Sequence, residues 1–235
     1  MNRGTLLTII AGVLILAALV GGSYGFKSWK ERSLITKIEK QLSTDVKTKD
    51  LVAAAVDAAS KIASNPTSPQ PYLLSGMAWK SVADASKEKY FYQKALDAYK
   101  SGIAHIEGVN SILFANAGDM AKELGDYAAA EGFYRQAIAS SPGDAGNYIS
   151  LIELYRYRLN KSQRDILAEY EAAMKTVVYG YNLVASRASY LKDIGRYEDA
   201  LGDFETLLTS KPDSQPIKNE IAELKAIIAQ QNLKK

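Results

Sequence analysis

The sequence contains no cysteine, one histidine and six prolines among its 235 residues. The lack of cysteine excludes disulfide bonds, thiolate catalysis, thiolate metal sites and a lipid anchor on cysteine. His105 has no partner at metal-ligand spacing, so we expect no metal site and no cofactor. Glycine-rich phosphate loops and nucleophile elbows are also missing, so we expect no catalytic residue and no enzymatic activity. His105 is instead expected at the surface or half-buried, near the end of a helix.

The chain also lacks a strong charge of either sign. Its formal net charge is +3, which is too small to favour a nucleic-acid partner. Hydrophobic residues make up 47% of the chain and charged residues 23%, values typical of a folded protein rather than a disordered one. We therefore expect a globular body that binds no nucleic acid.

Residues 4–26 contain no charged side chain. A helix of that length rises roughly 35 Å, which is enough to cross a hydrocarbon core of about 30 Å. Arg3 precedes the stretch, and Lys27, Lys30 and Arg32 follow it. We expect a short tail at 1–3 and an uncleaved transmembrane signal anchor at 4–26, which makes the chain a single-pass membrane protein.

Two alternatives concern this segment. It could be a cleaved signal peptide, with the small residues of 21–23 at the cleavage site. The side of the membrane is also open, because the richer Lys and Arg content after the segment favours a cytoplasmic body. A very short basic tail before an apolar run is, however, typical of an export signal, so we favour an extracytoplasmic body.

Residues 27–68 are expected to form juxtamembrane helices. The charged part, 27–49, is interpreted as a solvated stalk, with contact to anionic head groups as the alternative. Asp50 is expected to be the N-cap of the next helix. Ala54 and Ala58 have helical spacing within that helix, which suggests a degenerate repeat over 33–68.

The clearest pattern lies in 111–144. Small and apolar residues recur there at helical spacing in two arcs, with Gly125 between them and Pro142 at the end. The spacing predicts two short amphipathic helices joined by a tight turn. The residues that carry the two arcs include Phe114, Gly118, Ala130, Tyr134 and Ala137.

This pattern resembles the tetratricopeptide repeat, a helix–turn–helix unit of about 34 residues. The resemblance implies that two helices cross closely at small residues, with an aromatic ring filling the space beside the crossing. Such a unit cannot bury both faces alone, so it occurs in stacks. The fold class expected is an all-α solenoid.

Three further segments fit the same pattern with local changes, so the solenoid is expected over 69–214. The units are 69–110, with a longer middle that predicts extended helices or an enlarged turn, 111–144, 145–180 and 181–214. Ile166 replaces a small residue in the third unit, which predicts a wider helix crossing. Residues 215–235 are expected to form a polar-faced capping helix. The packing residues expected in these units are Gly76, Tyr99, Tyr148, Tyr170, Ala188, Ala200 and Phe204.

The resemblance also implies a concave groove lined by the first helix of each unit. One basic residue per unit occupies an equivalent place: Lys80, Lys122, Arg156 and Lys192. Asp119, Glu153 and Tyr157 lie nearby, and together these residues suit an extended peptide with acidic residues or a free carboxylate. The alternative is an ordinary solvated face whose cations pair with carboxylates one turn away. Leu73 and Met77 replace the polar residues that the heat-shock-chaperone type of groove uses, so that ligand is not expected.

The function expected is that of a membrane-anchored bacterial repeat protein. Such a protein would act as a scaffold for protein–protein interaction, in a secretion, envelope-assembly or chaperone complex. One alternative is a signal-cleaved, soluble extracytoplasmic binding module. A regulatory or enzymatic helical domain is the second alternative.

Overall fold

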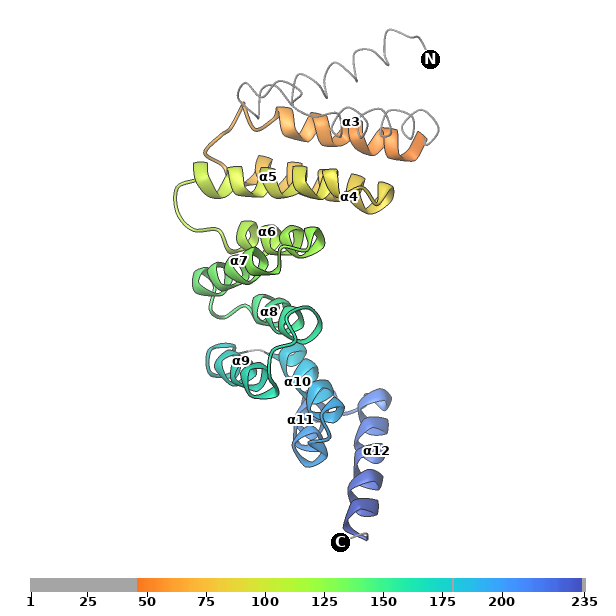
Figure 1. The fold of residues 1–235 in the computed structure, drawn as a ribbon. Coiled ribbons are helices and arrows are strands. Elements are labelled where there is room, and N and C mark those ends of the chain that lie inside the picture. Colours follow the sequence, from red (N-terminus) through yellow and green to blue (C-terminus); the bar gives the residue numbers. More distant parts are fainter. Residues whose placement is uncertain (1–45, 179, 234–235) are drawn as a thin grey trace. The chain divides into compact units, whose positions relative to one another are not determined.

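The computed structural model describes residues 46–178 and 180–233, and within them all regular secondary structure is helical (Figure 1). The chain divides into two compact units, one ending at Phe133 and the other beginning at Tyr134. The predicted transmembrane segment, 4–26, lies outside the described residues. Among the residues that are described, none of the helices combines the length and apolar character needed to cross a membrane.

The first unit is a series of helices that pack mainly on their neighbours in sequence. Helix α3 packs on α4, α4 on α5, and α5 on α6. Figure 1 shows α3, α4 and α5 side by side. The helices are α3 (Val46–Ser60), α4 (Pro69–Ser86), α5 (Lys89–His105) and α6 (Ser111–Leu124), and the unit boundary falls inside α7 (Tyr127–Ser140).

Helix α3 corrects the prediction made for its start. Its described part runs from Val46, so Asp50 lies inside the helix and is not its N-cap. The buried stripe contains Thr48, Val52 and Ala55, while Ala54 is exposed. A helix that buries this stripe has to begin before Thr48, and that requirement outweighs the preference of an aspartate for the cap.

The ends of the helices follow from side-chain caps and left-handed residues. The Ser68 hydroxyl accepts a hydrogen bond from the Gln70 amide at 3.4 Å, and the Asn110 side chain accepts one from the Leu113 amide at 3.1 Å. Gly125 ends α6 with φ 88°, which costs glycine little because it has no Cβ. The two long helices α4 and α5 are separated by Lys87 and Glu88, so the extra length of this repeat lies in its helices, as one of the two predicted options had it.

Close approach between α4 and α5 depends on Gly76. A Cβ atom placed there would lie 2.2 Å from the ring of Tyr99, which is 1% exposed. A Cβ atom placed at Gly102 would lie 2.8 Å from the Cβ and 3.0 Å from the ring carbon Cγ of Tyr72. The missing side chains therefore make room for two tyrosine rings, and the ring of Trp79 stacks on Phe91 beside them, with centroids 5.8 Å apart.

The second unit is also built from helices that pack on one another. Helices α10 and α11 pack closely, with Gly195 at φ 78° in the turn between them, and α8 and α9 share a smaller contact around the buried Ile166. Asn160 takes φ 47° near the α8–α9 connection, where the sequence has no turn glycine. The helices are α8 (Ala145–Tyr157), α9 (Gln163–Thr176), α10 (Tyr181–Asp193), α11 (Tyr197–Ser210) and α12 (Gln215–Asn232).

Helix α12 packs against the last helix pair through one apolar face. Ile217 and Ile221 pack with Leu207 of α11. Leu224 is fully buried in a cluster with Leu191. The burial of this apolar face is the main source of free energy that holds α12 in place.

The packing residues expected from the sequence occupy different depths. Phe114 and Phe204 are half-buried, so these two rings lie at the margin of the core. The others are buried: Gly76, Tyr99, Gly118, Ala130, Tyr134, Tyr148, Tyr170, Ala188 and Ala200.

Gly76→Ala is expected to destabilise the protein. The new methyl group would overlap the Tyr99 ring, and such overpacking typically costs roughly 1–3 kcal/mol of unfolding free energy. Gly132→Ala is the matched control, because Gly132 lies inside α7 and a Cβ there meets nothing within 4 Å. The control should gain about 0.5–1 kcal/mol from helix propensity. Urea unfolding followed by circular dichroism measures both, and equal stabilities for the two variants would contradict this account of the core.

Candidate functional site

The predicted groove cations of the first unit are each paired on their own helix. The Lys80 ammonium lies 2.6 Å from the Asp84 carboxylate, and Lys122 lies 3.3 Å from Asp119. Asp84 also accepts a hydrogen bond from the Tyr92 hydroxyl at 2.8 Å. Burial and this carboxylate together raise the pKa of Tyr92 to about 12. Both cations of this unit are thus neutralised by carboxylates close by.

Arg156 of the second unit is built into a contact between helices. Its side chain is 11% exposed and lies 2.8 Å from the Asp193 carboxylate of α10. The guanidinium lies over the rings of Tyr157 and Tyr190, with its carbon 4.9 and 4.7 Å from the centroids. An arginine held between two rings and a carboxylate joins α8 to α10 and has little surface left for a ligand.

Lys192 of the same unit contacts the capping helix. Its ammonium lies 2.7 Å from Glu220 and 2.9 Å from Glu223, both on α12. The hydrogen bonds to these two glutamates raise the pKa of Lys192 above its ordinary value. Lys192 therefore holds α12 against α10.

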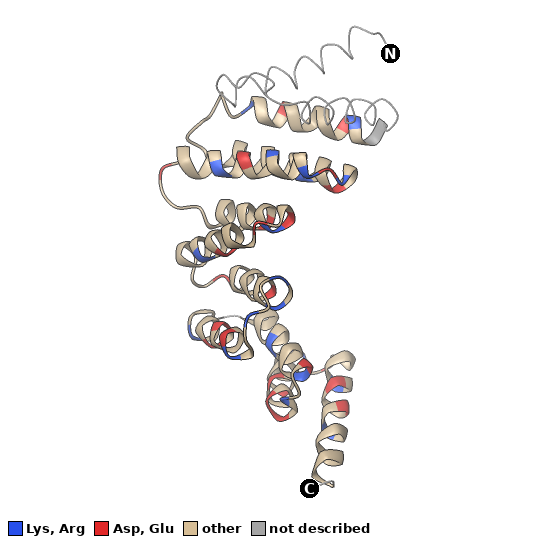
Figure 2. Cartoon of the chain, viewed as in Figure 1, with Lys and Arg blue, Asp and Glu red and all other residues tan. Residues whose placement is uncertain are grey.

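All four predicted groove cations are paired: Lys80 and Lys122 with carboxylates of their own helices, Arg156 and Lys192 with carboxylates of other helices. Figure 2 shows Lys and Arg interspersed with Asp and Glu on the helices. Of the other predicted groove residues, Asp119 is engaged by Lys122, Glu153 is exposed, and Tyr157 is 61% exposed. A peptide-binding role for these residues stays a prediction.

Apolar side chains, rather than cations, are the conspicuous exposed groups on the first helices of the repeats in the first unit. Leu74 and Met77 of α4 are 44% and 56% exposed, and Ile112 of α6 is 56% exposed. The presence of Leu73 and Met77 where a chaperone-type groove is polar was the sequence signal for this surface. We call Leu74, Met77 and Ile112 the apolar face.

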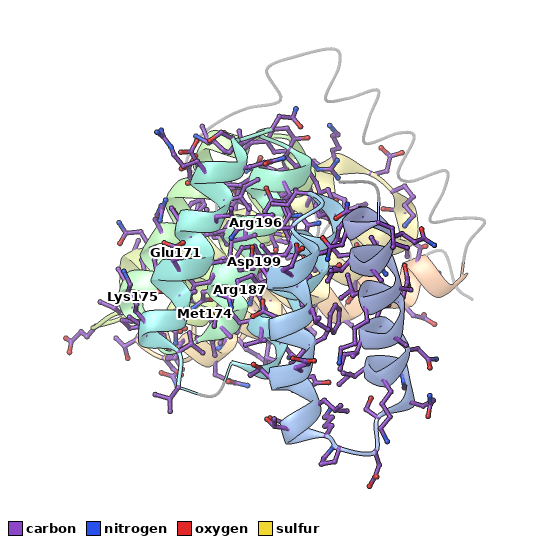
Figure 3. All side chains as sticks on the ribbon, turned by 90° about the horizontal axis from the view of Figure 1, so that it is seen from below. Glu171, Met174, Lys175, Arg187, Arg196 and Asp199 are labelled. Carbon is purple, nitrogen blue, oxygen red and sulfur yellow. The ribbon has the colours of Figure 1, made fainter. Side chains whose placement is uncertain are left out.

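The second unit contains a small pocket that the sequence interpretation missed. Its volume is about 130 Å³, and its walls come from α9, α10 and the start of α11 (Figure 3). The residues that line it are Leu167, Glu171, Arg187, Leu191, Arg196 and Asp199. They are spread over three helices, so no short motif marks them. The one available signal was Arg187, which stands where the repeat usually has a leucine.

Arg187 is fixed in this pocket by Asp203. Its Nε and Nη2 atoms donate to the two carboxylate oxygens at 2.8 and 2.5 Å, and Asp203 is 6% exposed. Hydrogen bonding to this carboxylate raises the pKa of Arg187, and the charges of Asp199 and Glu171 act in the same direction. Arg196 is paired in turn with Asp199 at 2.6 Å.

Among the residue types that ligate metals, the described part of the chain contains one histidine, His105, at the end of α5. No group of three or more His, Cys, Asp or Glu side chains there is arranged to hold a metal ion. His105 is the exposed last residue of α5, as expected. Its Nδ1 lies 2.7 Å from the Ser101 carbonyl oxygen, and its ring stacks on Tyr72.

Comparison with known proteins gives matches at the level of three-dimensional structure. No protein-family model and no curated protein sequence matches the chain. The crystal structure of MamA matches with a TM-score of 0.54 and 14% identity, over 73% of this chain and 94% of MamA. A tetratricopeptide repeat protein from Parabacteroides merdae ATCC 43184 matches with a TM-score of 0.53 and 18% identity, over 83% of this chain and 73% of that one.

A third match is YrrB, described as a TPR protein with an unusual peptide-binding site. Its TM-score is 0.47 at 13% identity, over 76% of this chain and 87% of YrrB. The first two matches, with TM-scores above 0.5, support the fold. This chain therefore has the fold of the tetratricopeptide repeat proteins.

Proposed function

We propose that the protein is a membrane-anchored scaffold that binds partner proteins through the exposed surfaces of its helix pairs. The observation that carries the proposal is the apolar face of the first unit. Leu74, Met77 and Ile112 keep 44–56% of their surface in contact with water. Exposed large apolar side chains cost free energy unless a partner covers them, and protein interfaces use such residues at their centres.

The geometry of the first helices supports this proposal. Helix α4 is held against α5 through tyrosine side chains next to glycines, and α6 packs on α5 with Leu113 next to Gly102, so both helices present their outer surfaces on a rigid support. A rigid surface loses little conformational entropy on binding. Met77 and Ile112 stand at places that the repeat family uses to line its groove, so an extended peptide of a partner protein is the ligand that suits this face.

The membrane part of the proposal rests on the sequence. The uncharged stretch 4–26 has the length and composition of a spanning helix, and basic residues flank it on both sides. An anchor directly before a repeat array would concentrate a bound partner at the membrane surface. A complex for secretion, envelope assembly or chaperone activity is the setting we propose, with the repeats on the extracytoplasmic side.

Met77→Ser combined with Ile112→Ser is expected to lower partner recovery about fivefold or more, because central apolar contacts dominate interface energies. The measurement is a quantitative pull-down with the tagged full chain, solubilised from its membrane. Val109→Ser combined with Val178→Ser is the matched control, since those valines are 70% and 82% exposed and lie in connecting segments. Equal losses in the two double variants would contradict the role of the apolar face.

Ser189→Cys tests the side of the membrane. Ser189 is exposed on α10, and the chain contains no cysteine, so the new side chain would be its only thiol. Labelling of intact cells by a membrane-impermeant maleimide is expected, since the proposal places the repeats outside the cytoplasm. Lysed cells and the cysteine-free parent are the controls. Labelling only after lysis would place the repeats in the cytoplasm and direct the search for partners there.

A further inference from the structure

We propose that the pocket between α9, α10 and α11 binds a lysine side chain of a partner protein. Its volume of about 130 Å³ is well below the range of roughly 300–1,000 Å³ that small-molecule sites occupy. A pocket of this size suits the end of one side chain rather than a cofactor or a metabolite. The inference rests on the proposed protein-binding function in taking the ligand from a partner.

The charges of the pocket favour a cation. Arg187 is paired with Asp203, which lies outside the pocket lining, and Arg196 is paired with Asp199, so these pairs leave the negative charge of Glu171 over. Among the described residues, the Glu171 carboxylate has no hydrogen-bond or ion-pair partner. One additional positive charge would therefore neutralise the pocket and give Glu171 its partner.

Arg187 is not available as a receptor for an anion. Two of its nitrogen atoms already donate to Asp203, which is almost fully buried. The negative charges of Asp199 and Glu171 also act on this guanidinium and raise its pKa. An incoming carboxylate or phosphate would meet these two negative charges first, so the pocket disfavours anions.

The walls also fit the rest of a lysine side chain. Leu167 of α9 is half-buried and Leu191 of α10 is 3% exposed, and both line the pocket. Figure 3 shows Glu171 on α9 across from Arg187 and Asp199. An aliphatic stem lying on the two leucines would thus carry its ammonium group to carboxylates on either side of the opening.

Lys175 lies one helical turn beyond Glu171 and is the nearest competing cation on α9. It does not line the pocket, and no ion pair joins it to Glu171. Its positive charge lowers the affinity for a cationic ligand without blocking the opening. Lys175→Gln should therefore strengthen lysine binding modestly, whereas a site for anions would respond in the opposite direction.

The experiment is a titration of the purified, isotope-labelled full chain in detergent micelles, followed by NMR amide shifts. The probe is the peptide acetyl-Gly-Gly-Lys-Gly-Gly-amide, and its norleucine and glutamate counterparts are the comparison peptides. We expect saturable shifts confined to amides around the pocket, at roughly millimolar affinity, from the lysine peptide alone. Equal responses to norleucine, a preference for glutamate, or no saturable response to lysine would each overturn the proposal.

Glu171→Gln should weaken lysine-peptide binding about fivefold, since one partly exposed charge pair is lost. Glu198→Gln is the matched control, because it removes the same charge from an exposed site of α11 that does not line the pocket. An unchanged affinity in Glu171→Gln, or an equal loss in the control, would overturn the assignment. The two glutamate variants test the pocket alone. The pull-down with the apolar-face variants tests the scaffold function, so the two proposals can fail independently.

Discussion

The close approach of a tyrosine side chain to a glycine is the contact on which the first unit depends. Gly76 lets α4 lie against the Tyr99 ring, and Gly102 does the same for Tyr72. The hydroxyl of Tyr72 reaches the Pro66 carbonyl at 2.8 Å, so a buried ring keeps its polar end satisfied. Helix pairs fixed in this way have one distance and one crossing angle, and each pair can present its outer surface without loss of packing.

In the second unit, charged side chains link neighbouring helices to one another. Arg135 of α7 donates to Glu169 of α9 and to the Tyr155 hydroxyl of α8, and thereby ties three helices together. Arg156 and Lys192 likewise join consecutive helices to one another. These cations hold helices in position, while apolar burial supplies most of the free energy. Binding is therefore better sought at exposed apolar side chains and at unpaired charges than along a row of paired ones.

The sequence was sufficient to predict the helix pairs, but it was insufficient to predict the partners of the charged side chains. Spacing along one chain fixes which residues share a helical face, so Gly125, Tyr134 and Ala200 could be placed from the repeat pattern. It does not fix which carboxylate a long side chain reaches on another helix, so the partners of Arg156 and Lys192 could not be predicted. The cap predicted at Asp50 was also wrong, because Asp50 lies inside α3, whose buried stripe includes Thr48. The pocket could not be predicted either, because its lining residues come from three helices that are brought together only by the fold.

The stacking of Trp79 on Phe91 makes the first unit distinguishable from the second by spectroscopy. Trp79 is 6% exposed, and the residues from 134 onward contain no tryptophan. Tyrosines, in contrast, are buried in both units. In a Trp29→Phe chain, the emission of the Trp79 indole thus follows the first unit, while far-ultraviolet dichroism follows both. Whether the two units unfold together or in sequence can accordingly be read from a single denaturation with two signals.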